Sequence, residues 1–429
     1  MAVCETGGCL SGYSFRTVAV LFSLGLLTSS SYVLTSAIGV SLYLARIGAG
    51  SLPLILSVSA VIVVLVSALT YSVIVRVSTK ACLFVAWVLL AMGSLTLSVY
   101  VQHSDHSLYV LGWIYVLAEI RGCLNTVFLT TLATDAFGAG TSKRPYVWVA
   151  AGAPIAGIVT GLILNYEASV ITDVQYLRII ACLDVLVLIV AVFLPKTSRS
   201  ISLANSNAAD PAETGEPLGG SLSEASSSVV LRQKRLRFRS LLSLLIVAKA
   251  VVLTLVGFEW KLSVSEHLQG DETALISYFA VYYAVTDVLI LGLQLLVAGK
   301  ILDRFGSSLA ILGYPVLLAV VAVLALATKT TFMLLVLITV ARGMDVIRRA
   351  FHDPALSSAF SKLDEKLRLS GIIVAQGVFK PTAEVLTAIA LLLAAPILNV
   401  HSVTAWWAIA LAFWVLIAAL TCRVSRDLA

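Results

Sequence analysis

The apolar stretch Tyr115–Phe137 carries a carboxylate, a guanidinium and an amide within its first eleven residues. They belong to Glu119, Arg121 and Asn125. A charge at the centre of a membrane-spanning helix costs about 2.5–3.5 kcal/mol on insertion scales, so charges retained there usually serve a solute, ion or proton pathway. Arg121 and Asn125 are four residues apart and share a helix face, whereas Glu119 lies on another face. Each charge therefore needs a partner on another helix or a wet cavity.

Other apolar stretches contain a similar mixture of charges. Lys249 stands in one of them, and Arg342 and Asp345 stand in another at a spacing that lets them partly neutralise one another. Arg and Lys would bind the negative groups of a substrate, while the acids hold the cations together in the empty site or accept a proton. We therefore predict a site for a polar or anionic substrate, with these binding residues: Glu119, Arg121, Asn125, Lys249, Arg342 and Asp345.

A fourth apolar stretch holds a cation and an acid on either side of a proline. Lys380 and Glu384 are four residues apart, and Pro381 permits a kink between them. Two interpretations remain open: a charged gate beside the substrate, or a self-neutralised pair at a fixed kink.

Two acids and two glycines in the apolar stretches have simpler interpretations. Asp184 and Asp287 are expected to form structural hydrogen bonds, with a proton relay as the alternative. Gly157 and Gly161 have the spacing that favours close helix packing. A patch of polar side chains near the N-terminus has two interpretations. It lines a cavity, or its hydroxyl groups form hydrogen bonds with backbone carbonyls. It consists of Ser29, Ser30, Ser31, Tyr32 and Thr35.

The composition identifies the class of protein that carries these charges. Of 429 residues, 59% are hydrophobic and 12% are charged, whereas soluble domains carry about 25% charged residues. The sequence predicts an all-α, polytopic membrane protein with twelve transmembrane helices, because each apolar run is long enough to span a bilayer, which takes about 17–25 residues. The runs lie near 17–41, 52–75, 81–101, 108–133, 146–164, 177–195, 240–262, 273–299, 307–327, 331–350, 370–396 and 402–422.

The distribution of basic residues predicts the orientation. If the N-terminus is inside, 21 of the 29 Lys and Arg residues fall in cytoplasmic segments. We therefore expect a multi-pass protein of the cell inner (plasma) membrane with both termini cytoplasmic. The positions of the charges explain the basic balance as a topology signal, so no nucleic-acid partner is expected.

The sequence predicts two halves joined by a linker. Residues 196–239 are rich in Ser, Ala, Gly and Pro and end in a basic cluster, which predicts a flexible cytoplasmic linker. It would join six-helix bundles at 1–195 and 240–429. The pairs Arg121-Gly122 and Arg342-Gly343 lie 221 residues apart, about the offset between the starts of the two bundles. This match favours duplicated halves.

The stretch "AGKILDRFG", 298–306, resembles the Gly-x-x-x-Asp-Arg-x-Gly loop of the major facilitator superfamily. The resemblance implies the two-bundle major facilitator fold, in which the first, fourth, seventh and tenth helices line a central cavity. It also implies a cytoplasmic loop in which Asp303 and Arg304 latch one conformation. We add them to Lys380 and Glu384 as candidate gating or coupling residues.

Three longer stretches, 42–77, 117–157 and 341–386, resemble the bacterial and plastid ADP/ATP carriers and their bacterial relatives. They share a Gly and Leu-Pro opening the second span, an acid in the fourth, and an Arg-rich end with "DPA" after the tenth. The resemblance matches Glu119 to the fourth-span acid, and Lys249 and Arg342 to cationic positions. It implies nucleotide exchange by an antiporter. The first span carries no charge after Arg16, so a relative with another substrate is an equal alternative.

The functional hypothesis is a secondary active transporter for a small polar or anionic solute, with a proton or counter-substrate as possible partner. One alternative is a proton-coupled drug or siderophore exporter, because "AGAPIAG" at 151–157 partly resembles a drug-antiporter motif. Another is a membrane scaffold that retains a transporter fold. The sequence shows no nucleophile elbow, phosphate loop or metal-ligand spacing. We therefore expect a monomer in the lipid bilayer that is not an enzyme and takes no metal or cofactor.

Overall fold

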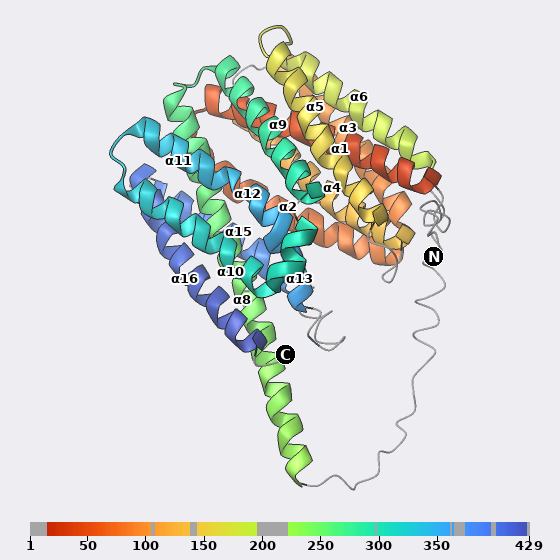
Figure 1. The fold of residues 1–429 in the computed structure, drawn as a ribbon. Coiled ribbons are helices and arrows are strands. Elements are labelled where there is room, and N and C mark those ends of the chain that lie inside the picture. Colours follow the sequence, from red (N-terminus) through yellow and green to blue (C-terminus); the bar gives the residue numbers. More distant parts are fainter. Residues whose placement is uncertain are drawn as a thin grey trace, which may run out of the picture. The chain divides into compact units, whose positions relative to one another are not determined.

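The computed structural model describes residues 15–103, 108–137, 144–194, 222–296, 298–360, 363, 374–395 and 400–426, and all regular elements in these ranges are helices (Figure 1). The protein is thus all-α, as the sequence predicts. In hydrocarbon the backbone cannot bond to water, and a helix satisfies its N–H and C=O groups within one segment.

The chain divides into two compact units. Unit 1 comprises Met1–Ile47, Leu65–Pro211 and Glu272–Val288. Unit 2 comprises Gly48–Val64, Ala212–Asp271 and Leu289–Ala429. Two helices, α2 (Leu52–Arg76) and α9 (Glu272–Leu296), each contribute one part to either unit.

Unit 1 is built around its first helix. Helix α1 packs against α4, α5 and α6, and α3 packs against α4 and α6. The bounds are α1 (Phe15–Arg46), α3 (Thr79–His103), α4 (Leu108–Phe137), α5 (Arg144–Glu167) and α6 (Asp173–Val192). The apolar core includes Trp87 and Phe128, whose rings meet edge to face with centroids 5.8 Å apart.

Unit 2 is built around one long helix, α8 (Leu222–His267), which packs against α16, α11 and α15. Helix α10 packs against α16 and against the segment that follows α11. The bounds of the other elements are η1 (Ala49–Ser51), α10 (Ala298–Ala327), α11 (Thr331–Gly343), α12 (Asp345–Ile347), η2 (Arg348–His352), α13 (Asp353–Phe360), η3 (Ala375–Phe379), α15 (Lys380–Ala394) and α16 (Val400–Arg426).

The helices have the lengths and surfaces of membrane spans. Within the described ranges, nine helices are long and apolar enough to cross a bilayer. The three other predicted spans correspond to α5, to α11 with α12, and to η3 with α15. Large apolar side chains such as Leu65, Leu89, Leu393 and Phe413 are exposed on helix surfaces, as suits a lipid environment.

Two predicted irregular segments are helical, and one predicted span is interrupted. Residues 222–239, expected in a flexible linker, belong to α8 because they contain no Gly or Pro. Residues 298–306, expected as a loop, open α10. The predicted span 331–350 is broken after Gly343, and its π-helix η2 leads into a further helix, α13.

Candidate functional site

Arg121 lies at the meeting point of four helices in unit 1. Its guanidinium, on α4, forms an ion pair with Asp184 of α6, and the exposed fractions of the two side chains are 1% and 0%. Arg121 Nε donates to Ser31 Oγ of α1 at 3.1 Å, and Nη2 donates to Ser94 Oγ of α3 at 2.7 Å. Ser31 Oγ also donates to Asp184 Oδ1 at 2.7 Å. The hydrogen bond expected for Asp184 is confirmed, and the pair gives Arg121 the interhelical partner that its charge requires.

Asn125 lies one turn further along α4 and contacts α1. Thr28 Oγ1 donates to Asn125 Oδ1 at 2.6 Å, and Asn125 Nδ2 donates to Ser29 Oγ at 3.0 Å. Within the polar patch, Thr35 follows the expectation of backbone bonding, since its hydroxyl donates to Ser31 O at 2.6 Å. Ser29 and Ser31 instead bond to side chains of other helices, because α1 packs directly against α4 and α6.

Glu119 differs from Arg121 and Asn125 in its surroundings. It is half-buried on α4, and no ion pair or hydrogen bond joins it to another described residue. Glu119 does not pair with Arg121, because the two side chains lie on different faces of α4. Among the predicted substrate-binding residues of unit 1, Glu119 is the charge that the described structure does not neutralise.

A network of alternating charges lies in unit 2. Lys249 of α8 is buried and forms an ion pair with Asp353 of α13, with 3.0 Å between Nζ and Oδ1. Asp353 also pairs with Arg348 of η2, and Arg348 pairs with Asp345 of α12. Arg349 Nε reaches Asp345 Oδ2 at 3.0 Å. Two carboxylates thus hold three cations near the turn between α11 and α13.

The same network determines the ionisation of its outermost carboxyl. Burial alone would raise the pKa of Asp353, but its hydrogen bond with His352 and the charges of Arg348 and Lys249 outweigh burial. The pKa of Asp353 therefore lies below its usual range, and the group is a carboxylate. The π-turn η2 aims Arg348 and His352 at this carboxylate, and single π-turns in helices often mark functional sites.

Arg342 lies at the end of α11, and its guanidinium carbon is 5.7 Å from the ring centroid of Trp260 on α8. A guanidinium over an indole face is stabilised by the ring quadrupole. Asp345 forms ion pairs with Arg348 and Arg349. Arg342 still acts on Asp345 electrostatically.

The predicted gating residues have different outcomes. Lys380 and Glu384 form the expected pair on one face of α15, with 3.7 Å between Nζ and Oε1, and both side chains are partly exposed. Pro381 follows the π-helix η3 and lies in the first turn of α15, where proline is tolerated. The side chains of Asp303 and Arg304 lie outside the described residues, so their latch role stays a prediction.

The sequence analysis missed Glu259, the most enclosed of the carboxyl groups described in unit 2. It lies on α8 with an exposed fraction of 0%. Thr404 and Trp407 of α16 both hydrogen-bond its side chain. The available signal was an acid within an apolar run, three residues before the end of the predicted span 240–262.

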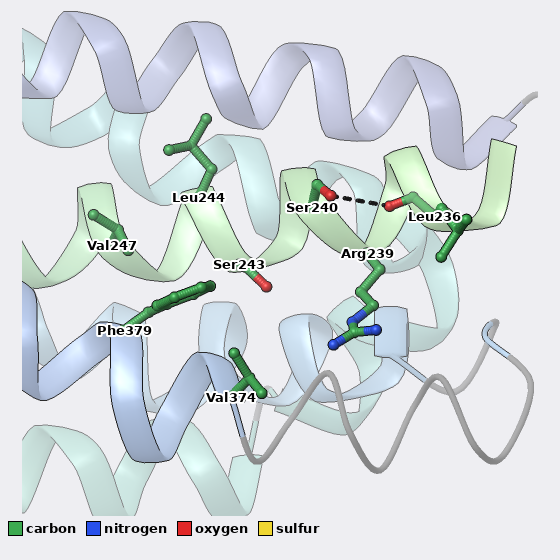
Figure 2. A pocket seen from close by; sticks show the side chains of 8 residues that line it. All are labelled: Leu236, Arg239, Ser240, Ser243, Leu244, Val247, Val374 and Phe379. Carbon is green, nitrogen blue, oxygen red and sulfur yellow. Dashed lines mark hydrogen bonds between the residues drawn. The ribbon is translucent and has the colours of Figure 1, made fainter. Parts of the chain in front are cut away.

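An open, largely apolar hollow of about 470 Å³ lies in unit 2 beside residues 236–247 of α8. Figure 2 shows Arg239 and Ser243 extending from α8 toward the side where Val374 and Phe379 lie. Arg239 is the charged residue among those lining the hollow. No residue that lines the hollow belongs to the charge network around Lys249.

Comparisons with known proteins agree on the architecture. No protein-family model and no curated protein matches the sequence. A POT family transporter with a bound thioalcohol-conjugated peptide is 13% identical and has a TM-score of 0.65, covering 96% of this chain and 97% of its own. A D-xylose-proton symporter is 13% identical, with a TM-score of 0.62, and covers 95% of this chain and 97% of its own. The human organic anion transporter MFSD10 is 16% identical, with a TM-score of 0.57, and covers 96% and 99%.

These identities are too low to carry function or family membership, but the alignments extend over nearly the whole of each chain. None of these three structures is described as an ADP/ATP carrier, so they do not support the resemblance to that family noted in the sequence. The helical spans and the full-length structural matches together establish that this polytopic membrane protein has the major facilitator fold.

Proposed function

We propose that the protein is a secondary active transporter that moves a small polar or anionic solute across the plasma membrane by alternating access. The fold supports this proposal, since its solved examples include a D-xylose-proton symporter and an organic anion transporter. In alternating access, two bundles expose one binding site to each side of the membrane in turn. The proposed carrier works as a monomer, with both termini in the cytoplasm.

The charge network of unit 2 is the observation that carries the proposal. Lys249 is buried in an apolar helix and Arg348 is largely buried beside it, and the carboxylates of Asp353 and Asp345 neutralise them. An isolated buried ammonium would be strongly unfavourable. An anionic solute that reached Lys249 would replace a carboxylate as its counter-ion. The same cations would then hold the substrate in the loaded carrier and the acids in the empty one.

The other predicted residues extend this proposal. Arg342, beside the network, would contribute a second cation toward the solute, and Glu119 would balance positive charge in the empty carrier. Arg121 and Asn125 already engage partners within unit 1, so their part is to hold α4 in place. Lys380 with Glu384 and Asp303 with Arg304 remain the proposed gating pairs. Nucleotides are one class of anion within this proposal, as the resemblance to ADP/ATP carriers implies.

Transport by the purified protein in proteoliposomes tests the proposal. We would measure uptake of radiolabelled ATP, inorganic phosphate and organic acids, with and without a proton gradient. At least one of these solutes should accumulate in liposomes that contain the wild-type protein. The absence of transport for the whole panel would contradict the proposal.

A pair of variants tests the role of the network. Lys249→Ala should reduce uptake at least tenfold and abolish the rise in melting temperature that the transported anion causes in the wild-type protein. The control is Lys329→Ala, which removes an exposed cation between α10 and α11 and should transport normally. Equal uptake by Lys249→Ala and wild-type protein would exclude Lys249 from the binding site.

A further inference from the structure

Glu259 of α8 is enclosed in an environment whose described residues include hydrogen-bond partners but no counter-ion. Its exposed fraction is 0%, and both of its oxygens are engaged by α16. Trp407 Nε1 bonds to Oε2, and the Thr404 hydroxyl bonds to Oε1. A buried carboxylate normally requires a cation or several donors, because transfer of an unpaired charge from water is very unfavourable.

The hydrogen atoms available to this cluster identify its protonation state. The indole of Trp407 can only donate, so Glu259 Oε2 accepts. Thr404 has one hydroxyl hydrogen, and its oxygen also lies 3.1 Å from the carbonyl oxygen of Val400, which can only accept. If Glu259 carries a proton on Oε1, it donates to Thr404, and Thr404 donates to Val400. A neutral acid therefore places a hydrogen in both contacts of the Thr404 hydroxyl oxygen, with Glu259 and with Val400, whereas a carboxylate leaves one of these two oxygen–oxygen contacts without a hydrogen.

The surrounding charges do not compensate for an ionised Glu259. The ionisable groups on the helices and turns that pack against α8 are His401, Arg423 and Arg426 on α16, Arg342 on α11, Lys380 and Glu384 on α15, and Asp353 on α13. On α8 itself, the nearest are Lys261 and Glu266. In the described part of the chain, none of these groups forms an ion pair or a hydrogen bond with Glu259. Arg342 lies over the ring of Trp260, the residue that follows Glu259 on α8.

We infer that Glu259 is a proton-binding site, which holds a proton while it lies enclosed between α8 and α16 and releases it when these helices part. Opening the contact admits water to the carboxyl, and ionisation then becomes favourable. Closing it again requires that a proton return to Oε1, because no cation among the described residues pairs with this carboxyl. That this proton couples to solute movement rests on the proposed transport function; the existence of the proton site does not.

Infrared spectroscopy of the full-length protein in lipid nanodiscs tests the inference without any substrate. A protonated carboxylic acid has a carbonyl stretching band that a carboxylate lacks. The wild-type protein should show this band at neutral pH and lose it reversibly at alkaline pH. Glu259→Gln should lack the band, and it should fold because the amide can donate to Thr404 and accept from Trp407. Glu266→Gln, two turns further along α8 at an exposed position, should retain it.

A second variant locates the proton. Trp407→Phe removes the donor to Oε2, so the carbonyl band should move to higher frequency without disappearing. Persistence of the band in Glu259→Gln, its absence from the neutral wild-type protein, or its retention up to the pH of unfolding would each overturn the inference. A wild-type protein that shows the titrating band but transports nothing would instead contradict the proposed function and leave the proton site supported.

Discussion

The guanidinium of Arg121 is held by side chains from three other helices, which makes it part of the framework of unit 1. Its ion pair with Asp184 is almost fully buried, and two serine hydroxyls complete the bonding. Replacing such a pair with apolar residues is often tolerated, but removing one partner leaves a charge in a low dielectric. The energetic role of Arg121 is therefore measurable apart from transport.

Asp184→Asn should destabilise the protein by about 3–5 kcal/mol, because Arg121 then keeps a buried charge without a counter-ion. The measurement is chemical unfolding in detergent. The double variant Arg121→Leu with Asp184→Leu should recover most of the loss. Glu384→Ala is the control, since it breaks a partly exposed pair and should cost about 0–1 kcal/mol. A loss for Asp184→Asn no larger than this control would show that the buried pair contributes nothing.

At the scale of elements, two glycines let α5 approach the first part of α9 within unit 1. A Cβ atom added to Gly161 would lie 2.6 Å from the backbone carbonyl oxygen of Ala280, and one added to Gly157 would overlap the carboxylate of Asp287. The close packing predicted from the spacing of these glycines is thus confirmed. Small residues permit such contacts in membranes, where helix association depends on close packing.

Gly161→Ala should lower the melting temperature by several degrees, because a backbone carbonyl cannot move aside as a flexible side chain can. Gly313→Ala is the matched control in α10, where a Cβ would meet no atom within 4 Å. That substitution should be neutral or stabilising, since alanine favours helix over glycine by about 1 kcal/mol. If both variants melt at the same temperature, α5 and α9 do not make this contact in the membrane.

At the scale of the whole molecule, the positions of Lys and Arg predict which ends of the helices face the cytoplasm. Single cysteines can be introduced after the six native cysteines are replaced by serine or alanine. Lys329→Cys, between α10 and α11, should react with a membrane-impermeant maleimide in intact cells. Arg237→Cys, exposed on α8, should react only after permeabilisation. The opposite pattern would invert the proposed topology.

The sequence alone determined the helical class, most span positions and the Lys380–Glu384 pair, because hydropathy and i,i+4 spacing are properties of one segment. The sequence analysis assigned residues 222–239 wrongly to a flexible linker, because the composition was taken over the whole segment 196–239. Residues 222–239 themselves contain no Gly or Pro and form a helix. The similarity of residues 298–306 to a loop motif also misled the assignment, since this stretch opens a helix.

The tertiary structure decided which charges meet. Arg121 and Asp184 are 63 residues apart, and Glu259 and Thr404 are 145 residues apart, so no spacing within a segment reports either contact. The sequence showed that Arg121 needed a partner, and helix packing selected Asp184 over the alternatives. The sequence likewise contained Glu259 as one acid among apolar residues. Its importance comes from enclosure by α16, which removes water and supplies neutral hydrogen-bond partners in its place.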